Sequence, residues 1–124
     1  MDPPAAANPS SVVNCIVYAR DDVHRDVPLG TLGELLARDR DSFAWIGLYE
    51  PDDGVLERLQ EQFGLHDLAI EDAHKAHQRP KLEAYGNAFF LVASTAQVVD
   101  RRIAYGETHV FFGPRYLITV RHGA

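Results

Sequence analysis

The chain has little of several features that would commit it to a function class. Its single cysteine, Cys15, lies in an apolar run, so a disulfide framework is excluded and we expect a buried thiol in a reducing compartment. Basic residues are also few, because 12 Lys and Arg stand against 18 Asp and Glu and leave a net charge of -6. Phosphate binding relies on clustered basic side chains, so we expect no nucleic-acid partner.

Long hydrophobic runs are missing as well. The longest unbroken apolar run, residues 88–93, is far shorter than the roughly 20 residues that a membrane-spanning helix needs. The opening MDPPAAANPS has an acidic second residue and no apolar core, so it is no signal peptide, and we expect residues 1–10 to be a disordered leader. Residues 11–124 then form one domain, whose core is supplied by a composition that is 46% hydrophobic.

Signatures of catalysis are absent too. The sequence contains no H-E-x-x-H, no G-x-S-x-G and no P-loop glycine pattern. Cys15 has no obvious base beside it in the sequence that would make it a nucleophile. We therefore expect that the protein is not an enzyme.

What the chain does have is a series of short strand patterns. The predicted strands are residues 12–19, 43–49, 81–85, 88–99, 103–112 and 116–120. The last four flank Gly86-Asn87 and Gly113-Pro114, which are turn signals. Residues 43–49 have apolar or small side chains on both faces, which predicts a central strand that is covered on both sides.

Helical spacing occurs between these strands. Thr31, with Glu34 three residues later, is arranged as a capping box and predicts a short helix to about Arg38. Pro51 suits the first turn of a second helix, and Gly64 is a natural stop for it.

A third helix is predicted over residues 66–77. Pro80 ends it, because the residue before a proline disfavours the helical conformation. The order of elements is strand, helix, strand, two helices and then hairpins. It predicts the α/β class, with a mixed β-sheet and helices packed on one face.

Three stretches resemble one known family. Residues 45–48, WIGL, and the Pro-Asp-Asp helix after them are similar to the family's W-I-D-L stretch and its following helix. Residues 63–72, FGLHDLAIED, resemble the motif F-G-L-H-P-L-x-L-E-D, and residues 77–83, HQRPKLE, resemble H-Q-R-P-K-V-E. On these motifs residues 43–122, and more loosely the chain from residue 12, resemble the N-terminal cytosolic domain of CorA-type magnesium and divalent-cation transporters. Gly47 and Asp67 depart from the family pattern, which has aspartate and proline there.

The resemblance implies a truncated form of the family's αβα sandwich, because the pore sequence Gly-Met-Asn, the stalk helix and the transmembrane helices are absent from this sequence. It further implies a regulatory and assembly domain on the cytoplasmic side of the cell membrane. The implied partners are its own subunits, as a homopentamer, and its own transmembrane region. We expect the isolated domain to leave an apolar sheet face uncovered and to be a monomer or a dimer.

The resemblance also implies a site. Glu71 and Asp72 match a Glu-Asp pair that contributes, in the family, to divalent-cation sites between neighbouring subunits. Carboxylates suit Mg²⁺, which prefers oxygen ligands and keeps several waters. Successive helical residues point about 100° apart, so the pair can serve two nearby sites, or one through water. The remaining ligands come from a neighbouring stalk in the family, so we expect only weak, regulatory Mg²⁺ binding.

A second pattern lies on the same predicted helix. Asp67, Glu71 and His74 are spaced at i, i+4 and i+7 and share one helical face, which His77 extends. Carboxylate and imidazole together suit Zn²⁺, Co²⁺ or another transition metal. The alternative is a polar stripe that faces water. Arg79 and Lys81, on either side of Pro80, are expected to form a structural salt bridge to Glu83 or another carboxylate, with anion binding as the alternative.

Two other functions stay open from the sequence. The chain could be the cytosolic domain of a CorA-related zinc or other divalent-metal transporter, or a stand-alone soluble binding module. The reading frame of the gene separates them, because a downstream Gly-Met-Asn with two apolar segments indicates a transporter.

Overall fold

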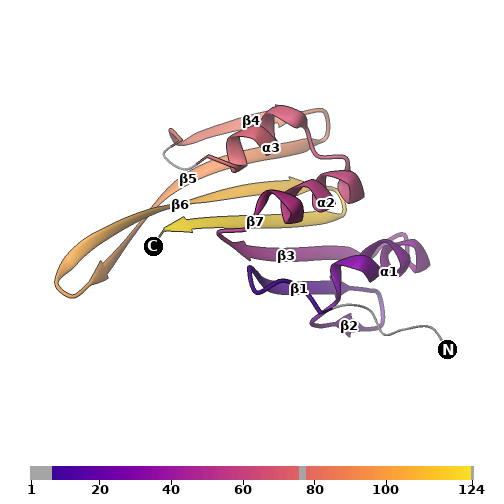
Figure 1. The fold of residues 1–124 in the computed structure, drawn as a ribbon. Coiled ribbons are helices and arrows are strands. Elements are labelled where there is room, and N and C mark those ends of the chain that lie inside the picture. Colours follow the sequence, from indigo (N-terminus) through magenta and orange to yellow (C-terminus); the bar gives the residue numbers. More distant parts are fainter. Residues whose placement is uncertain (1–6, 76–77, 124) are drawn as a thin grey trace.

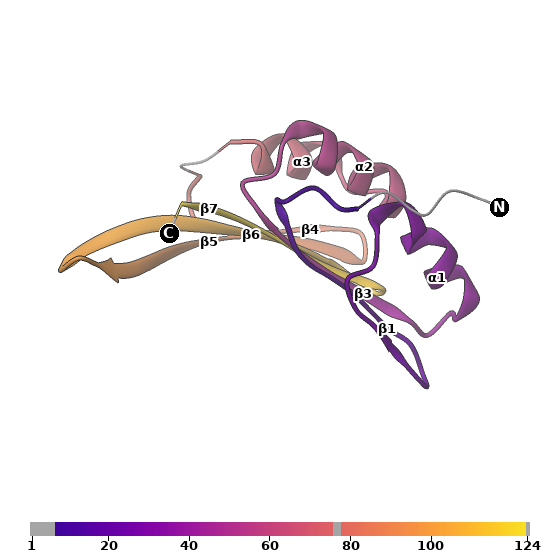
Figure 2. The same cartoon turned by 60° about the horizontal axis from the view of Figure 1, so that its bottom comes forward.

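The computed structural model describes residues 7–75 and 78–123, which form a seven-stranded sheet with helices on one side (Figures 1 and 2). The strands are β1 (Val12–Tyr18), β2 (Val23–His24), β3 (Phe43–Tyr49), β4 (Lys81–Tyr85), β5 (Ala88–Val99), β6 (Arg102–Gly113) and β7 (Tyr116–Gly123). The helical elements are η1 (Leu29–Thr31), α1 (Leu32–Arg38), α2 (Asp53–Phe63) and α3 (Asp67–Ala73). The predicted α/β class, with a mixed sheet and helices on one face, is confirmed.

The sheet order is β2-β1-β3-β7-β6-β5-β4. β3 and β7 run parallel, with Ala44 opposite Tyr116, whereas the other neighbouring strands are antiparallel. Parallel neighbours need a long crossover, and here it contains α2, α3 and β4 to β6. β3 therefore lies inside the sheet, as the apolar pattern of residues 43–49 predicted.

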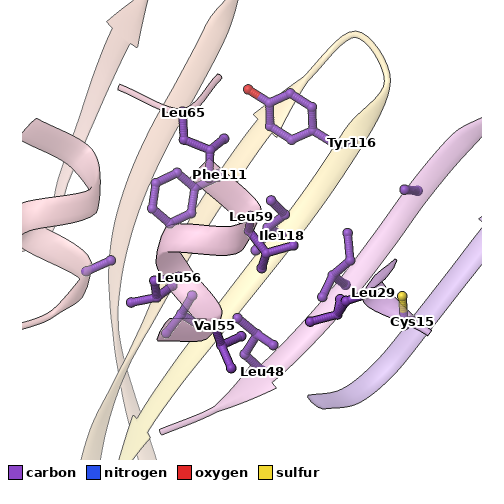
Figure 3. Packing of buried hydrophobic residues seen from close by; sticks show 14 of the residues in the cluster. Cys15, Leu29, Leu48, Val55, Leu56, Leu59, Leu65, Phe111, Tyr116 and Ile118 are labelled. Atoms are coloured by element: carbon purple, nitrogen blue, oxygen red, sulfur yellow. The ribbon is translucent and has the colours of Figure 1, made fainter. Parts of the chain in front are cut away.

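The helices and the sheet enclose one core, part of which is drawn in Figure 3. α2 contributes Val55, Leu56 and Leu59, which recur at helical spacing and are at most 3% exposed. They meet alternate residues of the strands, because side chains on every second strand residue share a face. The buried strand residues on this face include Ile46, Leu48, Phe90, Phe111 and Ile118.

The opposite face of the sheet carries no helix among the described residues (Figure 2). The prediction that β3 is covered on both faces is therefore wrong for the described residues. Apolar side chains on both faces of a strand do not reveal whether each face is covered. Phe89 stacks on Phe112 there, with ring centroids 4.9 Å apart, and remains 37% exposed. Leu82 beside them is 62% exposed, so an apolar sheet face is left uncovered, as expected.

One side chain and a glycine fix the ends of α2. Asp52 is the N-cap, and its Oδ1 accepts a hydrogen bond of 3.0 Å from the backbone N–H of Val55. Gly64 ends the helix at φ +65°, a conformation that side chains disfavour, so the predicted stop is confirmed. Pro51 precedes the N-cap, so its predicted place in the first turn is wrong.

The predicted capping box on α1 is wrong as well. Thr31 occupies the N-cap position, but its hydroxyl donates to the carbonyl of Pro28 at 3.0 Å. Glu34 instead accepts a hydrogen bond of 2.9 Å from Arg38. The reason is the 3₁₀ turn before α1, which places Thr31 at φ -106° and ψ -2° rather than in the extended conformation of a capping residue.

α3 is shorter than the predicted helix over residues 66–77. It ends at Ala73, where the N–H of Lys75 bonds to the carbonyl of Asp72 three residues back and tightens the last turn. At its start, Nδ1 of His66 accepts from the N–H of Leu68 at 3.1 Å and so caps the helix. His77, the predicted extension of the stripe, lies outside the described residues.

The structure describes only residues 7–10 of the expected leader, residues 1–10. Residues 1–6 lie outside the described residues. Asn8 belongs to the fold, because its side chain donates to the carbonyl of Val27 at 2.8 Å and accepts from the N–H of Leu29 at 2.7 Å. Part of the expected leader therefore packs on the domain, through polar contacts that composition does not reveal.

Candidate cation site on α3 and a buried histidine cluster

α3 presents the two predicted ligands to different surroundings. The side chain of Glu71 is 61% exposed, and its carboxylate lies 3.5 Å from Nζ of Lys75, which follows the end of α3. Asp72 turns toward the sheet, is only 25% exposed and forms an ion pair with Lys81 of β4. The two carboxylates therefore diverge, as helical geometry requires, and Glu71 is the one that faces solvent.

Lys81 lies at the centre of a polar network between α3 and β4. Its ammonium contacts Asp72 and lies 2.6 Å from Oε1 of Glu83, and the hydroxyl of Tyr85 donates to Glu83 at 2.5 Å. The hydrogen bonds to Asp72 and Glu83 raise the pKa of Lys81, with Asp72 as the largest cause. The hydrogen bond from Lys81 lowers the pKa of Glu83. Lys81 thus forms the structural salt bridge that its position predicted.

The other predicted ligands are held by different partners. Asp67 accepts a hydrogen bond of 2.6 Å from Nε2 of Gln60. Nδ1 of His74 lies 2.8 Å from Oδ1 of Asp53, at the first turn of α2. Within residues 7–75 and 78–123, no three His, Cys, Asp or Glu side chains gather closely enough to hold a metal ion. A cation on α3 therefore needs further ligands, which water or another chain can supply.

A cluster of titratable residues lies on the helix-covered face of the sheet. It was not predicted from the sequence. His109 is fully buried, and its Nε2 lies 2.8 Å from Oε2 of Glu107 on the same strand. His122, opposite Glu107 in the register of β6 and β7, has its ring centroid 5.0 Å from that of His109. We call Glu107, His109 and His122 the His109 cluster. The i, i+2 spacing of Glu107 and His109 was the available signal, because it places both on one face of a strand.

Burial also explains the two other titratable groups of the core. Cys15 is 2% exposed, and this desolvation raises the pKa of its thiol to about 11, which makes it unreactive. Burial likewise raises the pKa of Tyr116. The buried thiol that the sequence predicted is confirmed.

Comparisons with known proteins agree on one family. A family model described as CorA-like Mg²⁺ transporter protein matches residues 40–124. The cobalt/magnesium transport protein CorA of Thermotoga maritima is 41% identical over 58 residues, which are 44% of this chain and 16% of that protein.

Two solved structures have a similar fold. The soluble domain of CorA from Methanocaldococcus jannaschii has a TM-score of 0.63 at 16% identity, covering 90% of this chain and 41% of that one. The ZntB cytoplasmic domain from Vibrio parahaemolyticus has a TM-score of 0.63 at 8% identity, covering 89% of this chain and 43% of that one. The chain thus spans less than half the length of each of these relatives.

No helix within residues 7–75 and 78–123 is long and apolar enough to cross a membrane. The region that the family model matches includes α2, α3 and strands β3 to β7, which carry the candidate residues described above. Because the family model matches well over half of the chain and the fold agrees, the chain belongs to the CorA-like Mg²⁺ transporter family.

Proposed function

We propose that this chain acts as the cytosolic regulatory and assembly domain of a CorA-like magnesium transporter, and that it senses divalent cations where neighbouring subunits meet. The family consists of transporters rather than enzymes, which supports a role without catalysis. In this proposal the chain lies on the cytoplasmic side of the membrane and works with a transmembrane region. Its partners are copies of itself, as a homopentamer.

The observation that carries the proposal is the placement of the Glu71 carboxylate. It is exposed on α3, while Asp72 next to it is held by Lys81. A single exposed carboxylate binds Mg²⁺ weakly, because this ion keeps its waters and needs several oxygen ligands. Glu71 is therefore suited to a shared site, at which a second chain supplies the remaining oxygens.

A shared site of this kind gives feedback by population shift. When Mg²⁺ is abundant, it lies between the facing carboxylates of two subunits and holds the closed assembly together. When Mg²⁺ falls, those carboxylates repel each other and the assembly loosens. The ion shifts this equilibrium only by as much as it prefers the closed state.

The uncovered sheet face supports the assembly part of the proposal. Phe89 and Leu82 are exposed there, and contiguous apolar surface tends to be covered by a partner. In the isolated chain this face favours self-association. Light scattering of the 124-residue chain that shows a strict monomer at high concentration counts against this part.

Flux measurements on the whole encoded protein test the sensing role. We expect high internal Mg²⁺ to inhibit transport in proteoliposomes, and the Glu71→Ala, Asp72→Ala double variant to lose this inhibition. Glu61→Ala is the matched control, because it removes an exposed carboxylate from α2 and should leave the inhibition intact. A double variant that is inhibited like the wild type refutes the sensing role. A reading frame that stops after codon 124 refutes the transporter.

Other ions remain candidates for the same domain. The Thermotoga maritima relative is named for cobalt as well as magnesium, which supports Co²⁺ as a second cargo. Zn²⁺ is the alternative that Asp67 and His74 suggest by their ligand types. Isothermal titration with Zn²⁺, comparing the wild type with His74→Ala, tests it: equal binding excludes His74 as a ligand.

A further inference from the structure

His109 is a buried titratable group that no part of the proposed function uses. It lies on the helix-covered face of the sheet, because Phe111 two residues later is part of the core. Its side chain is fully buried, whereas Glu107 and His122 line a pocket of about 380 Å³ that opens to solvent. A proton can therefore reach the cluster from this pocket without unfolding of the sheet.

The hydrogen bonds of His109 define its protonation state. Nε2 has a carboxylate oxygen of Glu107 at 2.8 Å, whereas the buried Nδ1 has no hydrogen-bond partner. In neutral His109, Nε2–H donates to Glu107 and Nδ1 keeps only an unshared lone pair. A second proton would place an unpaired N–H and a positive charge in the core, which costs more than an unpaired acceptor.

His122 connects this cluster to α3. Its Nε2 lies 3.0 Å from the carbonyl oxygen of Ala73, the last residue of the helix, so Nε2–H donates to that carbonyl. The His122 ring also packs edge-on against His109, at 61° between ring planes. The end of α3 is thus fastened to the sheet through a ring that touches the buried imidazole.

The charged surroundings of His109 come from several elements. They comprise Glu107 on β6, His122 on β7, Asp72 on α3, Lys81 and Glu83 on β4, and Glu50 after β3. The neighbours on β5 are uncharged: Val92 is opposite His109 in the register, and the ring centroid of Phe90 is 5.9 Å from that of His109. Nζ of Lys81 lies over the same Phe90 ring, 5.9 Å from its centroid. Lys81 already forms ion pairs with Asp72 and Glu83, so Glu107, whose carboxylate lies 2.8 Å from Nε2 of His109, is the main group that can offset a proton on His109.

We propose that the His109 cluster is a proton-operated latch, which holds the C-terminal end of α3 on the sheet while His109 is neutral and releases it when His109 takes up a proton. The open form, in which α3 lifts away and His109 meets water, accepts the proton freely. The closed form resists it. Acid therefore shifts the population toward the open form.

The pH range follows from linkage. Desolvation is the main cause that lowers the pKa of His109 below its ordinary value of about 6.5, and it outweighs the opposing hydrogen bond to Glu107. Below pH 6.5 the open form binds more protons than the closed form, so closure is fully stable above that pH and weakens as the pH falls. One pH unit below 6.5, the population of the open form relative to the closed form rises by up to about tenfold over its value at neutral pH, the full factor being reached if the closed form takes up no proton.

Hydrogen–deuterium exchange of the 124-residue chain, without divalent cations, tests the latch. We expect the protection of the α3 amides, corrected for the intrinsic exchange rate, to fall between pH 7.5 and pH 5.5, by up to about tenfold. Amides of β1 and β3 should change less. Because no cation or membrane is needed, the result is independent of the proposed transport function.

Four variants distinguish the pH dependence caused by His109 from that caused by other histidines. His109→Gln should abolish the pH dependence, and Glu107→Gln should extend it to lower pH, because the offsetting charge is gone. His66→Asn keeps a capping oxygen on α3 without titrating, and His24→Gln removes an exposed histidine from β2; both should behave as the wild type. If His109→Gln does not fold, Glu107→Gln decides. An unchanged wild-type protection factor at pH 5.5, or pH dependence that survives in His109→Gln, overturns the proposal.

Discussion

Lys81 should hold Asp72 back from metal, so its removal should strengthen divalent-cation binding on α3. The ammonium contacts the Asp72 carboxylate and lies 2.6 Å from Glu83. A cation that approaches Asp72 must therefore displace this ion pair or bind around it. In Lys81→Met the aliphatic part of the side chain is kept, and the carboxylate of Asp72 is released from its ion pair.

The size of this effect depends on how well water screens the ion pair. The side chains of Lys81 and Asp72 are 31% and 25% exposed. Exposed ion pairs are worth about 0.2–1 kcal/mol, and we take the upper end because this pair is partly buried. About 1 kcal/mol corresponds to a roughly fivefold change in a binding constant. We therefore expect Lys81→Met to bind divalent cations about five times more tightly.

Mn²⁺ is a suitable probe, because it takes the same oxygen ligands as Mg²⁺ and broadens nearby NMR signals. Titration of the 124-residue chain should broaden the amide signals of Glu71 and Asp72 at lower Mn²⁺ concentration in Lys81→Met than in the wild type. Lys81→Arg keeps the charge and should match the wild type. If Lys81→Met and Lys81→Arg bind Mn²⁺ equally, Asp72 takes no part in binding and the reasoning fails.

Three further predictions concern stability and are measured by urea unfolding. His66→Ala should cost about 1 kcal/mol, because the cap on the Leu68 N–H is lost, whereas His66→Asn should keep most of it. Leu59→Ala should cost about 2–5 kcal/mol, because this fully buried side chain leaves a cavity between α2 and the sheet; a loss below about 1 kcal/mol would contradict that packing. Arg115→Met should cost about 1–3 kcal/mol, because the guanidinium donates to one backbone carbonyl of α1 and to two in the segment between α1 and β3, and Arg115→Lys should recover only part.

The fold was largely predictable because its signals are local. Residues 43–49 and 88–99 match β3 and β5 in both bounds, since β-branched and aromatic runs end at clear turn residues. Gly64 marks the end of α2 for an equally local reason, its left-handed φ. The errors arose at hydrogen bonds that the residue pattern does not reveal: Thr31 bonds backward into a 3₁₀ turn, and the side chain of Asn8 donates to the carbonyl of Val27, 19 residues away.

The candidate site was predictable only in part. That Glu71 and Asp72 diverge follows from helix geometry alone, but that Lys81 neutralises Asp72 depends on how β4 lies under α3. Spacing along one helix also placed Asp67, Glu71 and His74 on a stripe, whereas Gln60 and Asp53 of α2 bind the outer two. A pattern within one element cannot show which neighbour takes each side chain.

The His109 cluster also could not be predicted from a pattern within one element. Glu107 and His109 share a strand face by their spacing, but His122 joins them only because the antiparallel register of β6 and β7 sets it opposite Glu107. That register is fixed by the turn at residues 113–116, where Gly113 pairs with Tyr116. A one-residue slip there would turn His122 to the opposite sheet face and free the end of α3. The turn between β6 and β7 therefore controls the fastening of the helix that carries Glu71 and Asp72, although the two are far apart in the sequence.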